Sequence, residues 1–358
     1  MSSIGSFGAH LVPLTIAAAI AGAGMSVPAA GWIATALLCG QLATTLLLPI
    51  VGVRSIGRKA ATVSIGMLLL SLVLAGSDAD AAMISGWFFV GVFSGVLHFL
   101  GTVEAAHSDD PVAAFSLRLS LVLVLVAALI AIVQWIEAGS DYQFYLGCFG
   151  GFSLVIAVLG LLQFRPRAVV SAGAETKGET VKIAAFGGLA VLWLFFVGQT
   201  GLLGYVLVGA SRQGLGLVDA AWAFAAVKIT AALGLAVLNR RKFPGNEQVP
   251  FLALGIALAG GGYAMTVSTS TAGFFVMFAI FEICFNSVAA RLQGAVSKLA
   301  AAVSGRWIAA TALLGAAVGP PIHGYALGLG AEALFQVFAA CSALLPALWC
   351  GIAIARLR

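Results

Sequence analysis

The chain has 358 residues, of which 61% are hydrophobic and only 9% are charged, and its mean hydropathy is +1.09. A soluble domain needs much more polar surface than this composition supplies, so a water-soluble enzyme or nucleic-acid-binding domain is excluded. The basic pI of about 9.1 reflects cations that stand between apolar runs, and we expect no nucleic-acid partner.

Apolar runs of about 20 residues, the length that crosses a hydrocarbon core about 30 Å thick, follow one another along the chain. Each is predicted to be a transmembrane helix, because lipid offers the backbone no hydrogen-bond partner. The short connections make consecutive helices antiparallel neighbours, and the predicted fold class is an all-α membrane protein. The twelve predicted segments are 7–27, 30–53, 59–76, 81–107, 112–137, 143–164, 182–208, 218–238, 249–267, 271–293, 305–328 and 332–355.

One polar stretch divides these segments into two sets of six. It runs from Arg165 to Thr180 and mixes Pro, Gly, Ser and charged residues, a composition typical of a flexible linker. We therefore predict a six-helix bundle over 1–164, a cytoplasmic linker over 165–181 and a second six-helix bundle over 182–358.

Lysine and arginine concentrate in alternate loops, and this bias marks the cytoplasmic side of a membrane protein. Sixteen of the eighteen cations lie on one side, with Arg212 outside and Lys228 within a helix as the exceptions. We predict a multi-pass protein of the cytoplasmic (inner) membrane with both termini in the cytoplasm.

Catalytic and metal-binding patterns are missing from the sequence. The five cysteines fall inside predicted helices without metal-ligand spacing, which is typical of packing residues. An intramembrane enzyme needs paired carboxylates, a nucleophile with a base, or clustered metal ligands. The absence of a Walker motif argues against ATP-driven transport by this chain alone. We expect no enzyme activity and no cofactor.

The loop between segments 30–53 and 59–76 carries the most specific motif. It reads Gly52-Val-Arg-Ser-Ile-Gly57-Arg58-Lys59 and is similar to the loop signature of major facilitator superfamily permeases, a glycine and an Asp-Arg pair followed by Gly-Arg-Lys. Arg54 stands where the family has its Asp. With twelve segments and a central linker, the chain resembles a major facilitator superfamily permease over its whole length.

This resemblance implies two six-helix bundles related by a pseudo-two-fold axis, with a central site that opens alternately to either side of the membrane. It implies that the first, fourth, seventh and tenth helices line the cavity. It also implies that Gly57, Arg58 and Lys59 belong to an inner gate. We expect a monomer, surrounded by membrane lipid, that moves a small-molecule substrate.

Two ionisable residues stand inside predicted helices, where a charge is costly and is a functional candidate by default. Lys228 and Glu282 each lie roughly 15 Å from the outer end of a helix at a rise of about 1.5 Å per residue. This matching depth predicts an ion pair near the midplane. Either Glu282 takes up a coupling proton, or Lys228 receives an anionic substrate, or the pair only fixes a helix contact.

Polar residues form stripes on two of the predicted cavity helices. Asn286 follows Glu282 by one turn on the same face and is a candidate for the cavity wall. Ser94, His98 and Thr102 form a second stripe. Since an unperturbed histidine titrates near neutrality, His98 is either a proton site or a neutral hydrogen-bonding residue.

Glu104 lies on another face of the same helix as His98, nearer to the cytoplasm. We predict that Glu104 contacts Arg118, which opens segment 112–137, or a basic loop residue, as part of the inner gate.

Segment 182–208 combines Gln199, Trp193 and Tyr205 with glycines at 198, 201 and 204. This composition predicts a bendable helix that gates the outer half, and for both aromatic residues packing and substrate stacking remain open. His323 follows a double proline and is expected to reach the outer cavity. His10 is expected at the membrane interface.

These features predict a secondary active transporter of a small organic solute, coupled to protons. Lys228 favours an anionic substrate taken up by the cell. Apolar, aromatic surroundings favour the alternative of an exporter of amphipathic compounds. The altered loop motif keeps open a third function, a sensor that binds a solute without moving it.

Overall fold

The computed structural model describes residues 2–50, 58–106, 108–135, 141–162, 179–212, 214, 217–240, 248–268, 270–299 and 305–357. Within these ranges the chain forms thirteen α-helices and no strand. The helices are α1 (Ser2–Ala23), α2 (Val27–Ile50), α3 (Arg58–Ala75), α4 (Asp80–Ala106), α5 (Pro111–Trp135), α6 (Tyr142–Leu162), α7 (Glu179–Gly204), α8 (Val206–Arg212), α9 (Leu217–Arg240), α10 (Gln248–Val267), α11 (Thr271–Leu299), α12 (Gly305–Gly328) and α13 (Glu332–Leu357).

All helices except the short α8 correspond to predicted segments. Ten of them are long and apolar enough to cross a membrane in the described part of the chain. The protein is therefore a multi-pass membrane protein, as its composition predicts. We refer to α1–α6 as the N-half and to α7–α13 as the C-half.

The seventh segment differs from the prediction at both ends. Helix α7 starts at Glu179, inside the range expected for the linker, and residues 165–178 of that linker lie outside the described residues. The segment is also divided, because α7 ends at Gly204 and α8 begins after Tyr205. Glycine is a poor helix former, and the glycines near this end of α7 explain where the helix breaks.

Two of the predicted short connections are tight glycine turns. Gly24 follows α1 with φ of 69°, and the amide of Met25 donates to the carbonyl of Ala19 at 3.1 Å. Gly330 follows α12 with φ of 69°, and the amide of Ala331 donates to the carbonyl of Ala326 at 2.8 Å. This is the usual glycine-ended helix cap, and it lets the next helix turn back at once.

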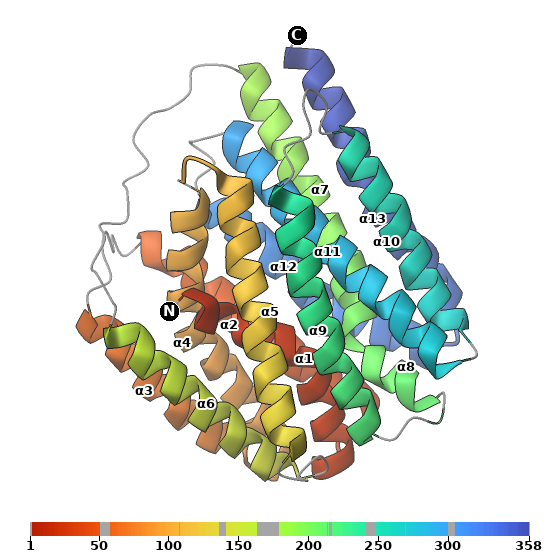
Figure 1. Ribbon diagram of the computed structural model, residues 1–358. Coiled ribbons are helices and arrows are strands. Elements are labelled where there is room, and N and C mark those ends of the chain that lie inside the picture. Colours follow the sequence, from red (N-terminus) through yellow and green to blue (C-terminus); the bar gives the residue numbers. More distant parts are fainter. Residues whose placement is uncertain are drawn as a thin grey trace.

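The helices are arranged around two long contacts between the halves. Helix α2 packs against α12, and α5 packs against α9. In Figure 1, α5 and α9 lie side by side in the middle of the bundle, α3 and α6 lie at one edge, and α10 and α13 at the opposite edge. The remaining helices α1, α4, α7 and α11 stand next to these contacts and position the side chains described below.

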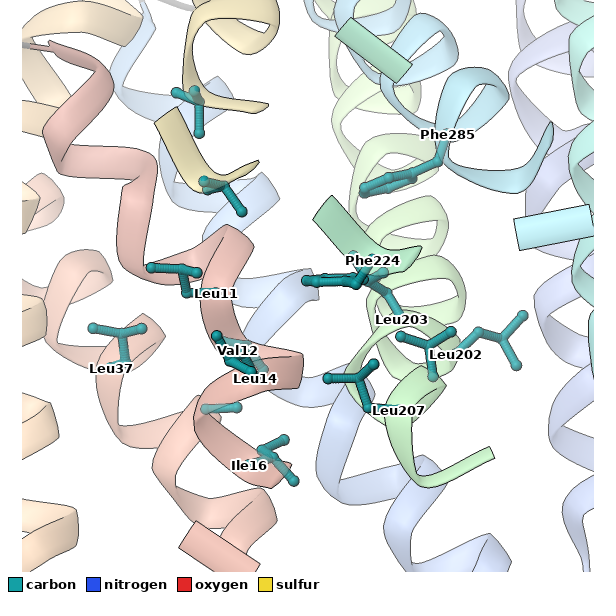
Figure 2. Packing of buried hydrophobic residues seen from close by; sticks show 14 of the residues in the cluster. Leu11, Val12, Leu14, Ile16, Leu37, Leu202, Leu203, Leu207, Phe224 and Phe285 are labelled. Atoms are coloured by element: carbon teal, nitrogen blue, oxygen red, sulfur yellow. The ribbon is translucent and has the colours of Figure 1, made fainter. Parts of the chain in front are cut away.

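Apolar side chains fill the interior between the halves. Figure 2 shows Val12 of α1, Leu203 of α7 and Phe224 of α9, which belong to one cluster of buried apolar residues. Other large apolar side chains are exposed on the outside of the bundle, for example Val73 of α3 and Leu334 of α13. Such a surface suits a protein whose outer face contacts lipid.

Candidate functional site

A cavity of about 110 Å³ lies between the two halves. Helices α1, α2, α4 and α5 line it from the N-half, and α7, α11 and α12 line it from the C-half. Most of its wall is apolar, and none of the described residues that line it is acidic. The polar side chains on the wall are those of Ser6, His10, His98, Thr102, Arg118, Thr200 and Gln293.

Arg118 of α5 carries the only charge that is permanent among these polar lining residues. Its Nη1 donates to Thr102 Oγ1 at 2.6 Å, and its Nη2 donates to Ser6 Oγ at 2.7 Å and to the carbonyl of His98 at 3.3 Å. Three helices, α1, α4 and α5, therefore hold one guanidinium at the cavity wall.

The imidazole of His98 takes part in the same cluster. Its Nδ1 lies 3.1 Å from Arg118 Nη2 and 3.1 Å from Ser6 Oγ. Because a guanidinium can only donate, Nδ1 must be the acceptor, and the proton of the neutral ring is then on Nε2. His98 is thus described as a neutral histidine that accepts a hydrogen bond from an arginine.

The Nε of Arg118 is a further donor. It is buried and has no hydrogen-bond partner among the described residues. A buried polar group without a partner costs about 1–3 kcal/mol, and a ligand oxygen that binds this N–H would recover that cost. The free Nε and the engaged Nη2 together form the side of the guanidinium that binds carboxylates with two hydrogen bonds.

Lys228 of α9 and Glu282 of α11 meet as predicted. Nζ of Lys228 and Oε1 of Glu282 form an ion pair, and both side chains are 0% exposed. Asn286 donates to Glu282 Oε2 at 2.8 Å, and the Lys228 ammonium lies 4.6 Å from the ring centroid of Phe224. Neither member of the pair is among the residues that line the cavity. The two charges compensate each other in the protein interior, outside the lining of the cavity.

The remaining predicted substrate residues bind neighbouring helices. Gln199 of α7 donates to the carbonyl of Ala339 at 2.8 Å and to Ser342 Oγ at 2.9 Å. His323 of α12 donates through Nδ1 to the carbonyl of Gly201 at 2.7 Å. Neither residue lines the cavity.

Two aromatic candidates on α7 and at its end also lie outside the cavity lining. Tyr205 packs edge-on against His323, with ring centroids 5.5 Å apart, and its hydroxyl points between Gly31 of α2 and Gly324 of α12. The indole Nε1 of Trp193 is buried and has no hydrogen-bond partner among the described residues. The structure thus brings Tyr205 together with His323, and both stand where α2, α7 and α12 meet.

The predicted inner gate is described only in part. Gly57 lies outside the described residues, and Arg58 and Lys59 begin α3 with side chains that are also outside them. Glu104 is exposed on α4. Arg118, expected near Glu104, lies instead with its guanidinium on the cavity wall.

Another polar contact between the halves was not predicted. Asn239 of α9 donates to Ser116 Oγ of α5 at 2.8 Å, and Arg291 Nε of α11 donates to Asn239 Oδ1 at 2.9 Å. Arg291 also donates to the carbonyl of Leu238 at 2.9 Å. These residues join α5 to α9 and α11 near the ends of the helices that carry the basic loops.

Sequence reasoning missed part of the cavity. His10 was expected at the membrane interface, whereas α1 starts at Ser2 and places His10 two turns into the helix, on the cavity wall. Arg118 was read as opening its helix, although it stands seven residues after Pro111. At about 1.5 Å per residue this is roughly 10 Å inside, a depth at which any arginine is a functional candidate.

Comparison with known proteins places the fold. No protein-family model and no curated protein matches the chain. Among solved structures, the human organic anion transporter MFSD10 (TETRAN) matches with a TM-score of 0.66 at 14% identity, over 98% of this chain and 96% of that one. The proton:xylose symporter XylE, bound to 6-bromo-6-deoxy-D-glucose, matches with a TM-score of 0.65 at 11% identity, over 99% and 94%. The chain therefore has the all-α membrane fold of these major facilitator superfamily transporters.

Proposed function

We propose that the protein is a secondary active transporter that carries a small organic anion, together with a proton, across the cytoplasmic membrane by alternating access. In this mechanism the bundles 1–164 and 182–358, joined by the linker 165–181, rock about the cavity between them. The coupling proton and the direction of uptake belong to the proposal.

The observation that carries this proposal is the guanidinium of Arg118 on the cavity wall, without an acidic residue among the described lining residues. A charge in a site of low dielectric is costly unless a partner compensates it. An anionic substrate supplies that partner, and a carboxylate matches the two-donor geometry of an arginine. The fold shared with a transporter of organic anions agrees with this substrate class.

Lys228 no longer supports the anion on its own, although the sequence suggested that it receives one. Glu282 already neutralises its charge, and the pair is fully buried outside the cavity lining. The proposal of an anionic substrate therefore depends on Arg118, which lines the cavity. Proton coupling through Glu282 stays one of the alternatives that the sequence leaves open, and its test is described in the Discussion.

Export of an amphipathic compound is the second candidate. Phe115, Phe196, Phe285 and several alanines and leucines line the cavity, and such a wall suits an apolar body. An exporter of neutral or cationic compounds would leave Arg118 without a function in binding, whereas an anion with an apolar body uses both parts of the site.

Purified protein in liposomes tests the proposal. With an inside-alkaline pH gradient we expect accumulation of a labelled small carboxylate such as pyruvate. Arg118→Gln should abolish this uptake, and Arg118→Lys should reduce it strongly, since lysine keeps the charge but loses the planar fork. Lys298→Gln is the matched control, because it removes one cation at an exposed position of α11 and should leave uptake unchanged.

Three results would count against the proposal. Uptake that is equal for the wild type and Arg118→Gln would remove the anion site. Binding of the carboxylate without flux would indicate a sensor. Movement of amphipathic cations but of no anion in the panel would favour the exporter.

A further inference from the structure

We infer that His98 holds Arg118 back from the empty cavity and releases it on taking up a proton, so that one proton and one small monocarboxylate bind together. This inference rests on the proposed function, because it assumes that Arg118 receives the anion. It assigns the coupling proton to a named atom, Nδ1 of His98, and it explains why proton and anion bind as a pair.

The first step is the state of His98 in the empty site. Two groups point at Nδ1, the Nη2 of Arg118 and the hydroxyl of Ser6, each at 3.1 Å. Both groups can donate a hydrogen bond, and the guanidinium of Arg118 cannot accept one. The lone pair of Nδ1 is therefore in use, and Nη2 is turned toward α4 and α1.

The second step is the geometry that a carboxylate requires. Two-donor binding along the side of a guanidinium uses Nε and Nη2. Nε is free among the described residues, but Nη2 is engaged by Ser6 and His98. Nη1 donates to Thr102 and can keep the arginine in place. The empty site thus offers a carboxylate one of the two donors that it needs.

The third step follows from protonation. A proton that adds to Nδ1 occupies the lone pair and turns this atom into a donor. It then faces the Nη2 hydrogens of Arg118, so their hydrogen bond is lost and two positive charges repel each other. The new N–H of His98 can donate to Ser6 Oγ. The Nη2 hydrogen that pointed at Nδ1 is released and joins Nε in binding the carboxylate, while Nη2 keeps its hydrogen bond to Ser6 Oγ.

The charges balance over this cycle. The empty cavity carries the single charge of Arg118, and the loaded cavity carries Arg118, an imidazolium and a carboxylate, so its net charge is unchanged. No bond of the substrate breaks, and on release the proton leaves Nδ1 for water as Arg118 returns to it. A second uncompensated positive charge, which would be costly, does not arise, because the carboxylate enters together with the proton.

The surroundings of His98 contain few other charges. Arg118 of α5 and His10 of α1 are the ionisable groups that act on it electrostatically within the described residues. On its own helix, Glu104 stands on a different face and is exposed. The pair of Lys228 and Glu282 lies behind the wall and is neutral as a unit. His10 is therefore the control histidine, because it lines the same cavity on another helix.

The cavity volume limits the anion. About 110 Å³ is less than the roughly 150 Å³ of a cavity that binds benzene, so the ligand should be compact. One guanidinium and one imidazolium suit a single carboxylate and leave the apolar wall for a short carbon chain. Pyruvate is a suitable probe, and methanesulfonate is a second probe that stays ionised at every pH used.

The experiment is calorimetric titration of the purified protein with pyruvate, in two buffers that differ in ionisation enthalpy at the same pH. The difference in heat gives the number of protons taken up with each anion. For the wild type we expect close to one proton, and an affinity that rises about tenfold for each unit of falling pH while His98 is neutral in the empty protein.

Two variants locate that proton. In His98→Asn the amide oxygen replaces Nδ1 as an acceptor for Arg118 but cannot be protonated, so proton uptake and the pH dependence should both disappear. In His10→Asn the proton uptake should persist, whatever the affinity. If His98→Asn folds poorly, the wild-type measurement still tests proton uptake, and His98→Gln, whose amide cannot be protonated either, replaces it in locating the proton.

Each remaining outcome overturns a defined statement. Anion binding by the wild type without proton uptake overturns this inference and leaves the anion site of Arg118 standing. Proton uptake that persists in His98→Asn overturns it as well and moves the proton to another group. If neither pyruvate nor methanesulfonate binds the wild type at any pH, the proposed anion site fails and this inference fails with it.

Discussion

Lys228 and Glu282 form a fully buried ion pair that joins α9 to α11 and does not line the cavity. The pair has additional partners in Asn286 and the ring of Phe224. Such a pair is expensive to break, because removal of one member leaves the other as an uncompensated buried charge. Because the pair lies outside the cavity lining, variants of Lys228 and Glu282 can distinguish a purely structural role from a role in proton coupling.

The first prediction concerns this pair. Glu282→Gln should lower the free energy of unfolding by about 3–5 kcal/mol, since Lys228 loses its counter-charge. The double variant Lys228→Met with Glu282→Gln removes both charges and should recover most of that loss. Thermal unfolding of the protein in detergent measures both effects.

Transport by the same variants tests the coupling role that the sequence predicts for Glu282. Because the pair does not line the cavity, we expect the double variant to regain carboxylate uptake driven by a pH gradient. A double variant that is stable but transports only down the substrate gradient would instead identify Glu282 as the coupling carboxyl. A stability that stays low in the double variant would contradict the account of the buried charge.

The second prediction concerns the hydroxyl of Tyr205. This group is buried and has no hydrogen-bond partner among the described residues. A Cβ on Gly31 would lie 2.6 Å from it, so α2 can approach here only with glycine. Tyr205→Phe removes an unsatisfied polar atom and should leave stability unchanged or raise it by up to about 1–3 kcal/mol.

Gly31→Ala provides the complement. The added methyl group should destabilise the protein by about 1–3 kcal/mol through overpacking, and Tyr205→Phe in the same chain should restore part of that stability. Comparison of the four unfolding temperatures gives the coupling between the two positions. If Tyr205→Phe lowers the substrate affinity without affecting stability, the hydroxyl contacts substrate in another state of the cycle, and packing is not its main role.

The helices and the buried ion pair could be predicted from the sequence because both depend on local quantities. Hydropathy over about 20 residues identifies a membrane helix. The cost of a buried charge predicts that Lys228 and Glu282 form an ion pair. The glycine turn at Gly330 lies in the short connection expected between the last two segments, whereas the turn at Gly24 lies a few residues before the expected end of segment 7–27. The helices and the glycine turns require no knowledge of which helices are neighbours, whereas the ion pair was expected from the matching depth of two charges on helices that the resemblance to permeases places beside the cavity.

The cavity could not be predicted in the same way. Ser6, His98 and Arg118 come from three helices, and only their packing brings the side chains together. Conversely, Gln199 and His323 look like cavity residues in the sequence, but each binds a backbone carbonyl of an adjacent helix. A polar side chain in a membrane helix is satisfied by either kind of partner, and helix periodicity does not distinguish them.

The third prediction concerns the size of the cavity. Ala312 of α12 is partly buried and lines the wall. Ala312→Leu adds three carbon atoms to a cavity of about 110 Å³, so pyruvate binding should fall at least tenfold while the unfolding temperature stays within a few degrees. Leu314→Phe, at an exposed position of the same helix, is the control and should bind normally. Normal binding by Ala312→Leu would place the substrate elsewhere.

The fourth prediction concerns orientation in the membrane. Alkaline phosphatase, which needs disulfides and so folds only outside the reducing cytoplasm, can be fused after Asp78, between α3 and α4, or after Asp109, between α4 and α5. Since the basic loops should face the cytoplasm, the fusion at Asp78 should be active and that at Asp109 inactive in a bacterial host. The reverse pattern would invert the topology and place the loop from Gly52 to Lys59 outside. A symporter moves its substrate in the direction in which protons flow, so the inverted protein would still drive uptake, with the protons entering from the opposite end of the bundle.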